Sequence, residues 1–349
     1  MTRTKQLFLQ GFENKVYSAG AIAVGKKDRI LYKESGGFVS FEPDALPVTD
    51  DTLFDMASIS KILSTTFLAF HMIEDGTLSL LDSLSDFFPD IPEDKKAITI
   101  HHLMTHSSGL PPEILLWKEC QDPSEALSKI LHAPLIYPTG KGVSYSCMGY
   151  ILLGKIIEKI TGENLHTLSQ KWIFKPLGMN QTGYHPVDRT DPDPACAYTE
   201  VLSLNGPTPP GIVHDENARF LNGISGNAGI FSSLNDMIRF CTMLSQKGAP
   251  LISERLFEIA CRNYTPGTDE NRGLGFQLSG PEPTFFGDLF GDTGIGHTGF
   301  TGTSFAVDPE TGLYVVLLTN RVHPTRENGA LTRLRHLIHN TAFTEFYQG

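Results

Sequence analysis

A serine and a lysine three residues apart, in Ser58-x-x-Lys61, form the first pair of residues that could do chemistry. Apolar residues recur at helical spacing over 59–73, so the pair is expected at the first turn of a helix, where positions i and i+3 share one face. A desolvated lysine beside a serine hydroxyl can take its proton or lower its pKa. The partial positive charge of a helix N-terminus favours an oxyanion. The pair therefore indicates acyl transfer, although a chain of this composition contains about one Ser-x-x-Lys by chance.

Tyr145 is a second candidate, because it lies just before an apolar-faced helix expected over 150–160 and closed by Gly162. A tyrosine on a loop that faces Ser58 and Lys61 could shuttle protons between the enzyme and its substrate. The phenol has an ordinary pKa of about 10, and a neighbouring Lys⁺ would have to lower it.

The segment His297-Thr298-Gly299 is a third candidate, at the start of an expected strand. A glycine at this position would let a substrate lie along the edge of the strand. The backbone N–H of the next residue, Phe300, could pair with the N–H of Ser58 to form an oxyanion hole.

Strand patterns occur at both ends of the chain and bracket a helical middle. The sequence predicts one antiparallel sheet built from both chain ends and flanked by helices, with a mostly helical lobe inserted, which is an α+β fold. The expected lobes are 1–80 with 220–349, and 81–185, joined by a proline-rich connecting loop over 186–219. The expected strands are 18–24, 29–32, 302–307 and 313–318, and the main expected helices are 4–13, 58–75, 100–105, 234–244 and 328–346.

The composition narrows the class of protein. The chain of 349 residues has a formal charge of −11, which argues against nucleic acid or an anionic membrane surface as a partner. No apolar run approaches the roughly 18 residues of a membrane span, and we expect no signal peptide. The five cysteines are scattered without a Cys-x-x-Cys pair, as in a reducing compartment, so a cytoplasmic location is expected. No pattern indicates an oligomeric state.

In their order along the chain, Ser58-x-x-Lys61, the Tyr145 element and His297-Thr298-Gly299 resemble the three active-site motifs of the serine β-lactamase and penicillin-binding-protein superfamily. Class C β-lactamases, DD-peptidases and family VIII carboxylesterases carry Ser-x-x-Lys, Tyr-x-Asn and Lys/His-Thr-Gly. The resemblance extends from about residue 15 to 340 and includes the stretches 54–61, 103–110, 174–179 and 226–232. It implies a β-lactamase/transpeptidase-like fold.

The resemblance also implies roles for individual residues. Ser58 would be the acylated nucleophile, and Lys61 would activate it and orient Tyr145. Tyr145 would be the general base for acylation and then the acid for the leaving group. The N–H groups of Ser58 and Phe300 would form the oxyanion hole. No metal or cofactor is expected, and the residues expected to bind substrate are Cys147, His297, Thr298 and Gly299.

Two residues depart from the family pattern. Cys147 stands where the family usually has an asparagine, and a thiol is a weaker donor and acceptor than a carboxamide. This substitution favours esters over β-lactams or peptides, with the thiol itself interpreted as a small buried filler. His297 replaces a lysine; it can still form hydrogen bonds, and its charge is expected to depend on pH.

Other polar residues are interpreted as having structural rather than catalytic roles, or as lying at the edge of the site. His102 and His106 have the i, i+4 spacing of a zinc site, but no glutamate follows the metalloprotease pattern, so a structural role is expected. The loop 214–217 is expected at the rim of the cleft. Arg321 could meet a substrate carboxylate or form a salt bridge at a strand end. The absence of Gly-x-Ser-x-Gly disfavours an α/β-hydrolase.

Together these observations predict a serine hydrolase that forms an acyl-enzyme on Ser58. A carboxylesterase or small-amide hydrolase is the first choice. A class C-like β-lactamase or D-alanyl-D-alanine carboxypeptidase is the alternative, and a non-catalytic penicillin-recognising module is the third possibility. The expected partner is a small ester, amide or β-lactam.

Overall fold

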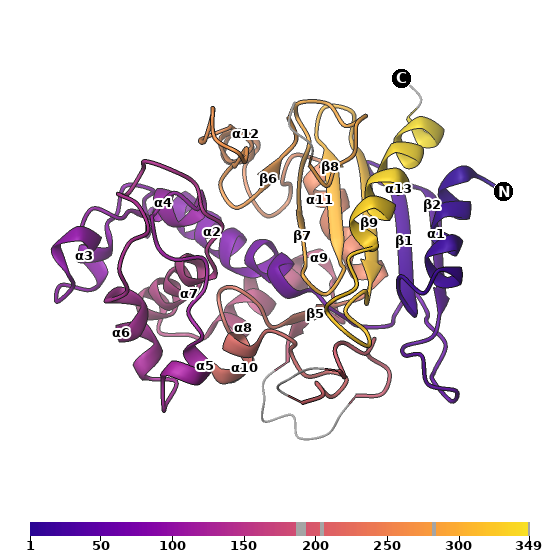
Figure 1. Cartoon of the computed structure of the whole chain (residues 1–349). Coiled ribbons are helices and arrows are strands. Elements are labelled where there is room, and N and C mark those ends of the chain that lie inside the picture. Colours follow the sequence, from indigo (N-terminus) through magenta and orange to yellow (C-terminus); the bar gives the residue numbers. More distant parts are fainter. Residues whose placement is uncertain (186–192, 203–205, 281–283, 348–349) are drawn as a thin grey trace.

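The protein has an α+β fold built around a six-stranded antiparallel sheet, seen in a computed structural model (Figure 1). The structure describes residues 1–185, 193–202, 206–280 and 284–347. The strands lie in the order β2-β1-β9-β8-β7-β6. Their bounds are Ala19–Lys26 (β1), Arg29–Gly37 (β2), Gln277–Leu278 (β6), Ile295–Thr298 (β7), Ser304–Asp308 (β8) and Leu313–Thr319 (β9).

Strands from both ends of the chain lie side by side in the sheet. β1 pairs with β9 in antiparallel register, with Ala23 opposite Val316, and each of these strands also pairs with its hairpin neighbour. Both strands are buried along nearly their whole length. Strands of this kind need cover on both faces of the sheet. The predicted antiparallel sheet from both chain ends is confirmed.

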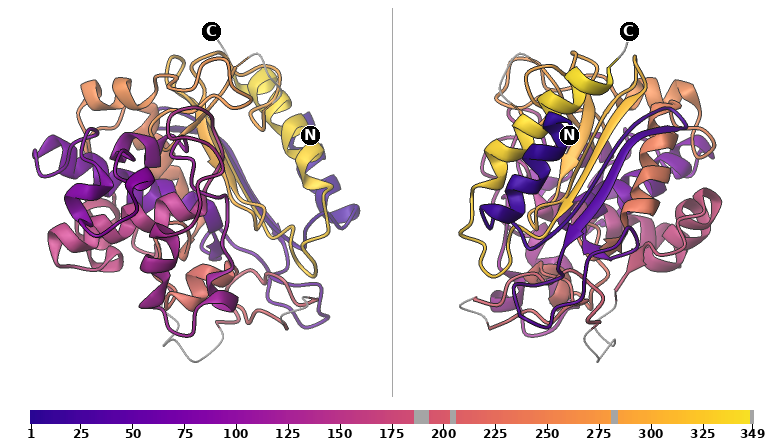
Figure 2. Two further views of the ribbon diagram at one scale, coloured as in Figure 1. Left: turned by 60° about the vertical axis from the view of Figure 1, so that its left-hand side comes forward. Right: turned by 90° about the vertical axis from the view of Figure 1, so that its right-hand side faces the viewer.

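Helices supply that cover on both faces. The terminal helices α1 (Arg3–Glu13) and α13 (Leu331–Phe346) lie next to each other on one face (Figure 2). They share a buried apolar cluster with Ile22 of β1 and Leu317 of β9. On the opposite face, α11 (Leu234–Ser245) packs against β1, β8 and β9. All three helices were predicted within a few residues of these bounds.

Helices are the main regular structure of the segment 81–185, in line with the prediction, and about half of its residues are helical; the division of the chain into lobes stays a prediction. α7 begins at Cys147, three residues before the predicted start, because the Ser146 hydroxyl caps it by accepting from the Gly149 N–H. The helices here are α3 (Leu84–Phe87), α4 (Ile100–Met104), α5 (Leu116–Glu119), α6 (Glu125–Leu131), α7 (Cys147–Thr161), α8 (Leu165–Ser169) and α9 (Lys175–Leu177). Elsewhere the chain forms α2 (Phe67–Glu74), α10 (Glu216–Phe220) and α12 (Glu254–Ala260).

A small second sheet was not predicted. It contains β3 (Phe54–Asp55), β5 (Ile230–Ser232) and β4 (Gly183–Tyr184), in the order β3-β5-β4. Strands of two or three residues are too short to show the alternation that marks a strand in a sequence. Beyond β3, the Met56 N–H donates to the Ile230 carbonyl oxygen at 2.9 Å, which fixes the chain just before Ser58.

The described part of the proline-rich segment consists mainly of turns and irregular backbone, except that α10 begins at Glu216, inside the predicted connecting loop. Residues 186–192 and 203–205, which belong to the predicted connecting loop, lie outside the described residues. Within the described part, Thr208 N–H donates to the Glu200 carbonyl oxygen, and Tyr198 N–H donates to that of Val39. Among all described residues, no helix combines the length and apolar character needed to cross a membrane.

Candidate active site

Ser58 and Lys61 are in direct contact. Ser58 lies in a 3₁₀ turn, Ala57–Ile59, at the start of the helical segment that continues into α2. The Lys61 Nζ lies 3.0 Å from Ser58 Oγ, and it also donates to the Asn227 carbonyl oxygen at 3.1 Å. The lysine side chain is fully buried. The predicted pair is therefore brought to hydrogen-bond distance, away from bulk water.

The backbone around Ser58 is less regular than predicted. A plain α-helix was expected from Ser58, but the 3₁₀ turn is followed by a π-helical turn over Lys61–Thr66. Ala57 has a φ of +44°, a costly conformation for a residue with a side chain. The Asp55 carboxylate holds it by accepting from the Ala57 N–H at 2.8 Å. We call residues 55–59 the serine turn; irregular helical turns of this kind are frequent at functional sites.

The Tyr145 ring lies over the lysine. Its centroid is 4.9 Å from Lys61 Nζ and 5.1 Å from the guanidinium carbon of Arg272. The Tyr145 hydroxyl is buried and has no hydrogen-bond partner among the described residues. Burial raises its pKa, and the opposing charge of Lys61 does not reverse this effect. Lys61 does lower the phenol pKa, as expected, but the expected net fall of that pKa is wrong because burial has the larger effect.

Opposing effects set the charge of Lys61. Burial lowers the pKa of its ammonium, whereas the acidic groups of Cys147 and Tyr145 raise it, and the net direction is upward. Lys61 therefore stays protonated at neutral pH. In the resting site it donates to Ser58 Oγ rather than accepting the serine proton.

His297 presents a hydrogen-bond acceptor to the site. Its Nδ1 lies 2.8 Å from the Thr298 carbonyl oxygen, so Nδ1 carries the proton and Nε2 keeps a lone pair. Nε2 has no partner among the described residues. Burial, together with the charges of Arg272 and Lys61, lowers the His297 pKa well below its usual value. The side chain is neutral at physiological pH, which corrects the expectation that its charge would vary there.

Gly299 allows two turns to approach closely. A Cβ atom at this position would lie 2.6 Å from the Met56 carbonyl oxygen, which is too close for any side chain. Next to it, the Thr301 hydroxyl donates to the Asp55 carbonyl oxygen at 2.6 Å. The glycine thus brings the Phe300 main chain up to the serine turn. This packing requirement differs from the predicted one, which was space for a substrate along the strand.

A cavity of about 500 Å³ opens beside these residues. Ser58 lines it from the serine turn, Cys147 from the first residue of α7, and Tyr145 from the loop before α7. His297, Thr298 and Phe300 line it from the sheet. The remaining lining residues are Ala57, Pro112, Glu113, His214, Asp215, Glu216, Glu270, Arg272, Gln277 and Arg326.

Charged residues that no motif marks also line the cavity, among them Glu113, Glu270, Arg272 and Arg326. Arg272 is 3% exposed, and its Nε donates to Glu270 at 2.8 Å. Its Nη1 is buried and has no hydrogen-bond partner among the described residues. A buried, unused guanidinium N–H at a cavity wall suits an oxygen atom of a ligand. Nothing in the spacing of these residues could have marked them in the sequence.

Arg321 does not have the position predicted for it. Its Nη1 donates to the carbonyl oxygens of Arg326 and Asn328, and its guanidinium carbon lies 4.6 Å from the Phe300 ring centroid. Arg326, not Arg321, lines the cavity. The position of Arg321 does not support a contact with a substrate carboxylate, and among the described residues no salt bridge to Arg321 replaces it.

The histidine-containing segments have the structural roles expected of them. The loop 214–217 reaches the cavity, where His214 lines the wall and Asp215 caps α10 by accepting from the Ala218 N–H. His102 closes the capping box at the start of α4, because its Nδ1 accepts from the Thr99 N–H at 3.1 Å. His106 is buried, and its Nδ1 accepts from the Ser146 N–H.

Cys147 contacts the lysine at the cavity wall, and its interpretation as a filler stays a prediction. Its Sγ lies 3.5 Å from Lys61 Nζ and lines the cavity. Burial raises the pKa of the thiol, so it stays neutral beside the lysine. A neutral thiol is a weak acceptor and a weak donor, so it cannot replace the carboxamide that the family carries at this position.

This position gives a direct test of substrate preference. The change Cys147→Asn places a carboxamide between Lys61 and the cavity, where it can donate to the carbonyl oxygen of a substrate amide. We expect the ratio of amide to ester kcat/KM to rise by about three- to tenfold, the value of one added hydrogen bond. Cys147→Ala is the control and should leave the ratio within about twofold of the unchanged protein. An unchanged ratio in Cys147→Asn would contradict the assigned recognition role.

The comparison with known proteins agrees with this geometry. Residues 5–340 match the Beta-lactamase family. The chain belongs to this family. The N-acetylmuramyl-L-alanine amidase of Bacillus subtilis (strain 168) is 29% identical over 343 residues, covering 87% of this chain and 77% of that protein. An Escherichia coli (strain K12) protein, whose name provisionally assigns it as a D-alanyl-D-alanine carboxypeptidase, is 31% identical over 349 residues and covers 88% and 79%.

Among solved structures, the fold is shared with EstCE1, described as a hydrolase with promiscuous acyltransferase activity. The two chains superpose with a TM-score of 0.78 at 21% identity, covering 98% of this chain and 97% of that one. The β-lactamase/transpeptidase-like fold predicted from the motifs is confirmed. The names of the two relatives, an amidase and a carboxypeptidase, describe hydrolysis of amide bonds.

Proposed function

We propose that the protein is a serine hydrolase that forms an acyl-enzyme on Ser58 and acts on esters or small amides. The observation that carries this proposal is the 3.0 Å contact between Lys61 Nζ and Ser58 Oγ beneath the cavity. The buried Tyr145 ring beside the lysine supports it. An activated serine needs a nucleophilic hydroxyl, a neighbouring cation and a group that accepts its proton.

The proposed reaction has two halves. Ser58 Oγ attacks the substrate carbonyl carbon while its proton passes to the Tyr145–Lys61 pair, and the N–H groups of Ser58 and Phe300 stabilise the oxyanion. The same pair then returns the proton to the leaving alcohol or amine as its bond to the carbonyl carbon breaks. Water then attacks the carbonyl carbon of the acyl-enzyme and gives one proton to the Tyr145–Lys61 pair. The pair passes a proton to Ser58 Oγ as its bond to the acyl group breaks, which releases the carboxylic acid and restores the serine hydroxyl.

The lining of the cavity supports a substrate with both a hydrogen-bond donor and an acceptor. Arg272 Nη1 offers an unused N–H, and His297 Nε2 offers an unused lone pair. Thr298 and Gly299 would form the strand edge beside them. Because Cys147 lacks a carboxamide, we propose esters as the preferred class. Small-amide hydrolysis is also consistent with the amidase and carboxypeptidase names of the relatives.

A β-lactamase or D-alanyl-D-alanine carboxypeptidase is the second candidate. The unused guanidinium N–H of Arg272 favours it, since such substrates carry a carboxylate. We propose a cytoplasmic location together with the esterase or small-amide hydrolase activity. The thiols of Cys120, Cys147, Cys241 and Cys261, which form no disulfide, support that location because free thiols persist in a reducing compartment.

The mass of the intact protein during turnover separates these candidates. The protein is mixed with a chromogenic short-chain ester in one tube and with benzylpenicillin in another. Fast ester turnover without a lasting penicillin adduct supports the esterase. Rapid loss of the β-lactam supports a β-lactamase, and a long-lived adduct on Ser58 supports a penicillin-binding peptidase or, without turnover of any substrate, a non-catalytic recognition module.

The titration of the Tyr145–Lys61 pair predicts the pH dependence. Both pKa values are raised, so both groups are protonated at neutral pH, and the reactive form has lost one of these protons. We expect ester kcat/KM to rise with pH, by about tenfold per unit between about pH 6 and 8. The neutral His297 contributes no step in this range. A flat profile measured with a pH-stable ester would contradict the assignment of the pair as proton acceptor.

A further inference from the structure

His214 lies between the two segments that would supply the oxyanion hole. Its ring stacks on Phe300, with 5.8 Å between ring centroids and planes 22° apart. Its main-chain N–H donates to the Asp55 carboxylate at 2.7 Å, and the other oxygen of that carboxylate holds the Ala57 N–H. One residue therefore contacts Phe300 and, through Asp55, the serine turn.

The Phe300 side chain needs the contact with His214, because burial does not hold the phenyl ring in place. Its side chain is 49% exposed at the cavity, so solvent leaves it free to turn. The guanidinium carbons of Arg321 and Arg326 lie 4.6 and 5.8 Å from its ring centroid. The stacked His214 ring completes a set of three side chains around the phenyl ring.

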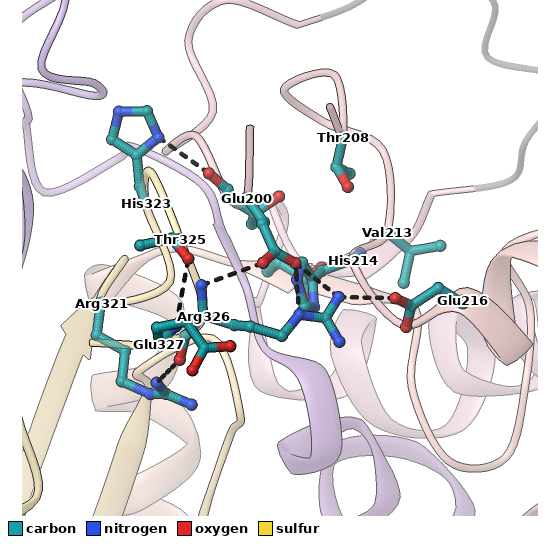
Figure 3. Close-up of polar contacts among 12 residues, drawn as sticks. Glu200, Thr208, Val213, His214, Glu216, Arg321, His323, Thr325, Arg326 and Glu327 are labelled. Atoms are coloured by element: carbon teal, nitrogen blue, oxygen red, sulfur yellow. Dashed lines mark hydrogen bonds and ion pairs between the residues drawn. The ribbon is translucent and has the colours of Figure 1, made fainter. Parts of the chain in front are cut away.

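A buried carboxylate anchors this set (Figure 3). Glu200 is 2% exposed, and its Oε2 lies 3.1 Å from His214 Nε2 and 2.6 Å from Arg326 Nε. Arg326 also reaches Glu216 at 2.7 Å. The carboxylate thus fixes both the histidine ring and the arginine that lies against Phe300. Because the Glu200 carboxylate is buried, its ion pair with the partly exposed Arg326 and its further hydrogen bonds hold these groups in one arrangement, and leaving the carboxylate without them is costly.

We propose that His214, anchored by Glu200, is a positioning residue that keeps the N–H groups of Phe300 and Ser58 at a fixed separation. This inference rests on the proposed function, in which those two groups bind the oxyanion. His214 itself takes no proton and forms no bond with the substrate carbonyl carbon. A shift of about 1 Å in one donor is enough to lower the rate by about a hundredfold, so the contacts of one side chain matter here.

The experiment compares an ester with its thionoester, in which sulfur replaces the carbonyl oxygen. Sulfur is larger and accepts hydrogen bonds weakly, so an intact oxyanion hole favours the oxygen compound. The ratio of the two kcat/KM values is independent of the fraction of folded protein, so a partly unfolded variant still gives a valid result. The variants are His214→Ala and Glu200→Gln.

We expect kcat for the oxygen ester to fall by about 10- to 100-fold in His214→Ala with little change in KM. The oxygen-to-sulfur ratio should fall by about tenfold, and Glu200→Gln should show the same direction with a smaller change. His323→Ala is the matched control. His323 is a buried histidine near the same loops, where it bonds to Phe41 and Thr199 instead of Phe300. Its ratio should equal that of the unchanged protein.

The outcomes are distinguishable. A ratio in His214→Ala equal to that of the unchanged protein overturns the positioning role, whatever happens to stability. An equal fall in His323→Ala also overturns it, because the effect would then be general loosening of the loops. If the unchanged protein and Ser58→Ala hydrolyse the ester equally, the proposed function fails and the positioning role fails with it.

Discussion

Replacing Ser58 with alanine is expected to abolish ester turnover, with a loss of about 10⁶-fold, the size seen when a serine nucleophile is removed. The hydroxyl is the only part of the residue that the change removes. Lys61 keeps its bond to the Asn227 carbonyl oxygen, so the buried ammonium retains a partner and the fold should be preserved. Two measurements check the result: the release of the chromogenic alcohol and the mass of the protein during turnover.

The neighbouring serine gives a matched control for this change. Ser60 belongs to the same helical segment, but its hydroxyl accepts from the Ile230 N–H and is fully buried. Ser60→Ala should still form the acyl adduct, whereas Ser58→Ala should not. Undiminished turnover or a persistent adduct in Ser58→Ala would place the nucleophile elsewhere and refute the proposed function.

Replacing Tyr145 with phenylalanine should lower kcat by about 10²- to 10⁴-fold, the range for a general acid–base group. The ring contacts with Lys61 and Arg272 remain, so the loss reports on the hydroxyl alone. That hydroxyl is one of the groups that raise the Lys61 pKa. Its removal should therefore move the rise of the residual activity to lower pH. Both the rate and the pH profile are measured with the same ester.

Tyr150 provides the control for this prediction. It is also buried close to Lys61, with 5.9 Å between Nζ and its ring centroid, but its hydroxyl is bonded to Thr66 Oγ1 at 3.1 Å. Tyr150→Phe should keep kcat within about threefold, the value of one ordinary hydrogen bond. Equal losses in the two variants would show that packing, not proton transfer, explains the Tyr145 effect.

Residues in local patterns could be predicted from the sequence. Ser58 and Lys61 are three positions apart on one helical turn, so their contact follows from helix geometry. Tyr145 and His297 have no such local relation to Ser58, and only the order of the motifs along the chain placed them together. The terminal strands and helices were found because they are long enough to show a period.

Features that depend on distant contacts could not be predicted in this way. Glu200, Arg272 and Arg326 follow no spacing rule, and each acquires its role from a segment far away in the sequence. Burial also reversed an electrostatic expectation. Lys61 was expected to lower the pKa of Tyr145, but the depth at which the phenol lies outweighs the charge. The amount of solvent left around a group is a property of the folded chain.

The pairing of β1 with β9 has a consequence for synthesis of the protein on the ribosome. Until β9 (Leu313–Thr319) has emerged, β1 can pair only with β2, and a two-stranded hairpin is marginally stable in water. The strand that carries His297, β7, likewise gains its β8 neighbour late, and β8 in turn pairs with β9. A nascent chain therefore holds Ser58 and Lys61 long before it can hold the rest of the site. The site can therefore form only after β9 has emerged, and chains cut short before β9 should be inactive and prone to aggregate.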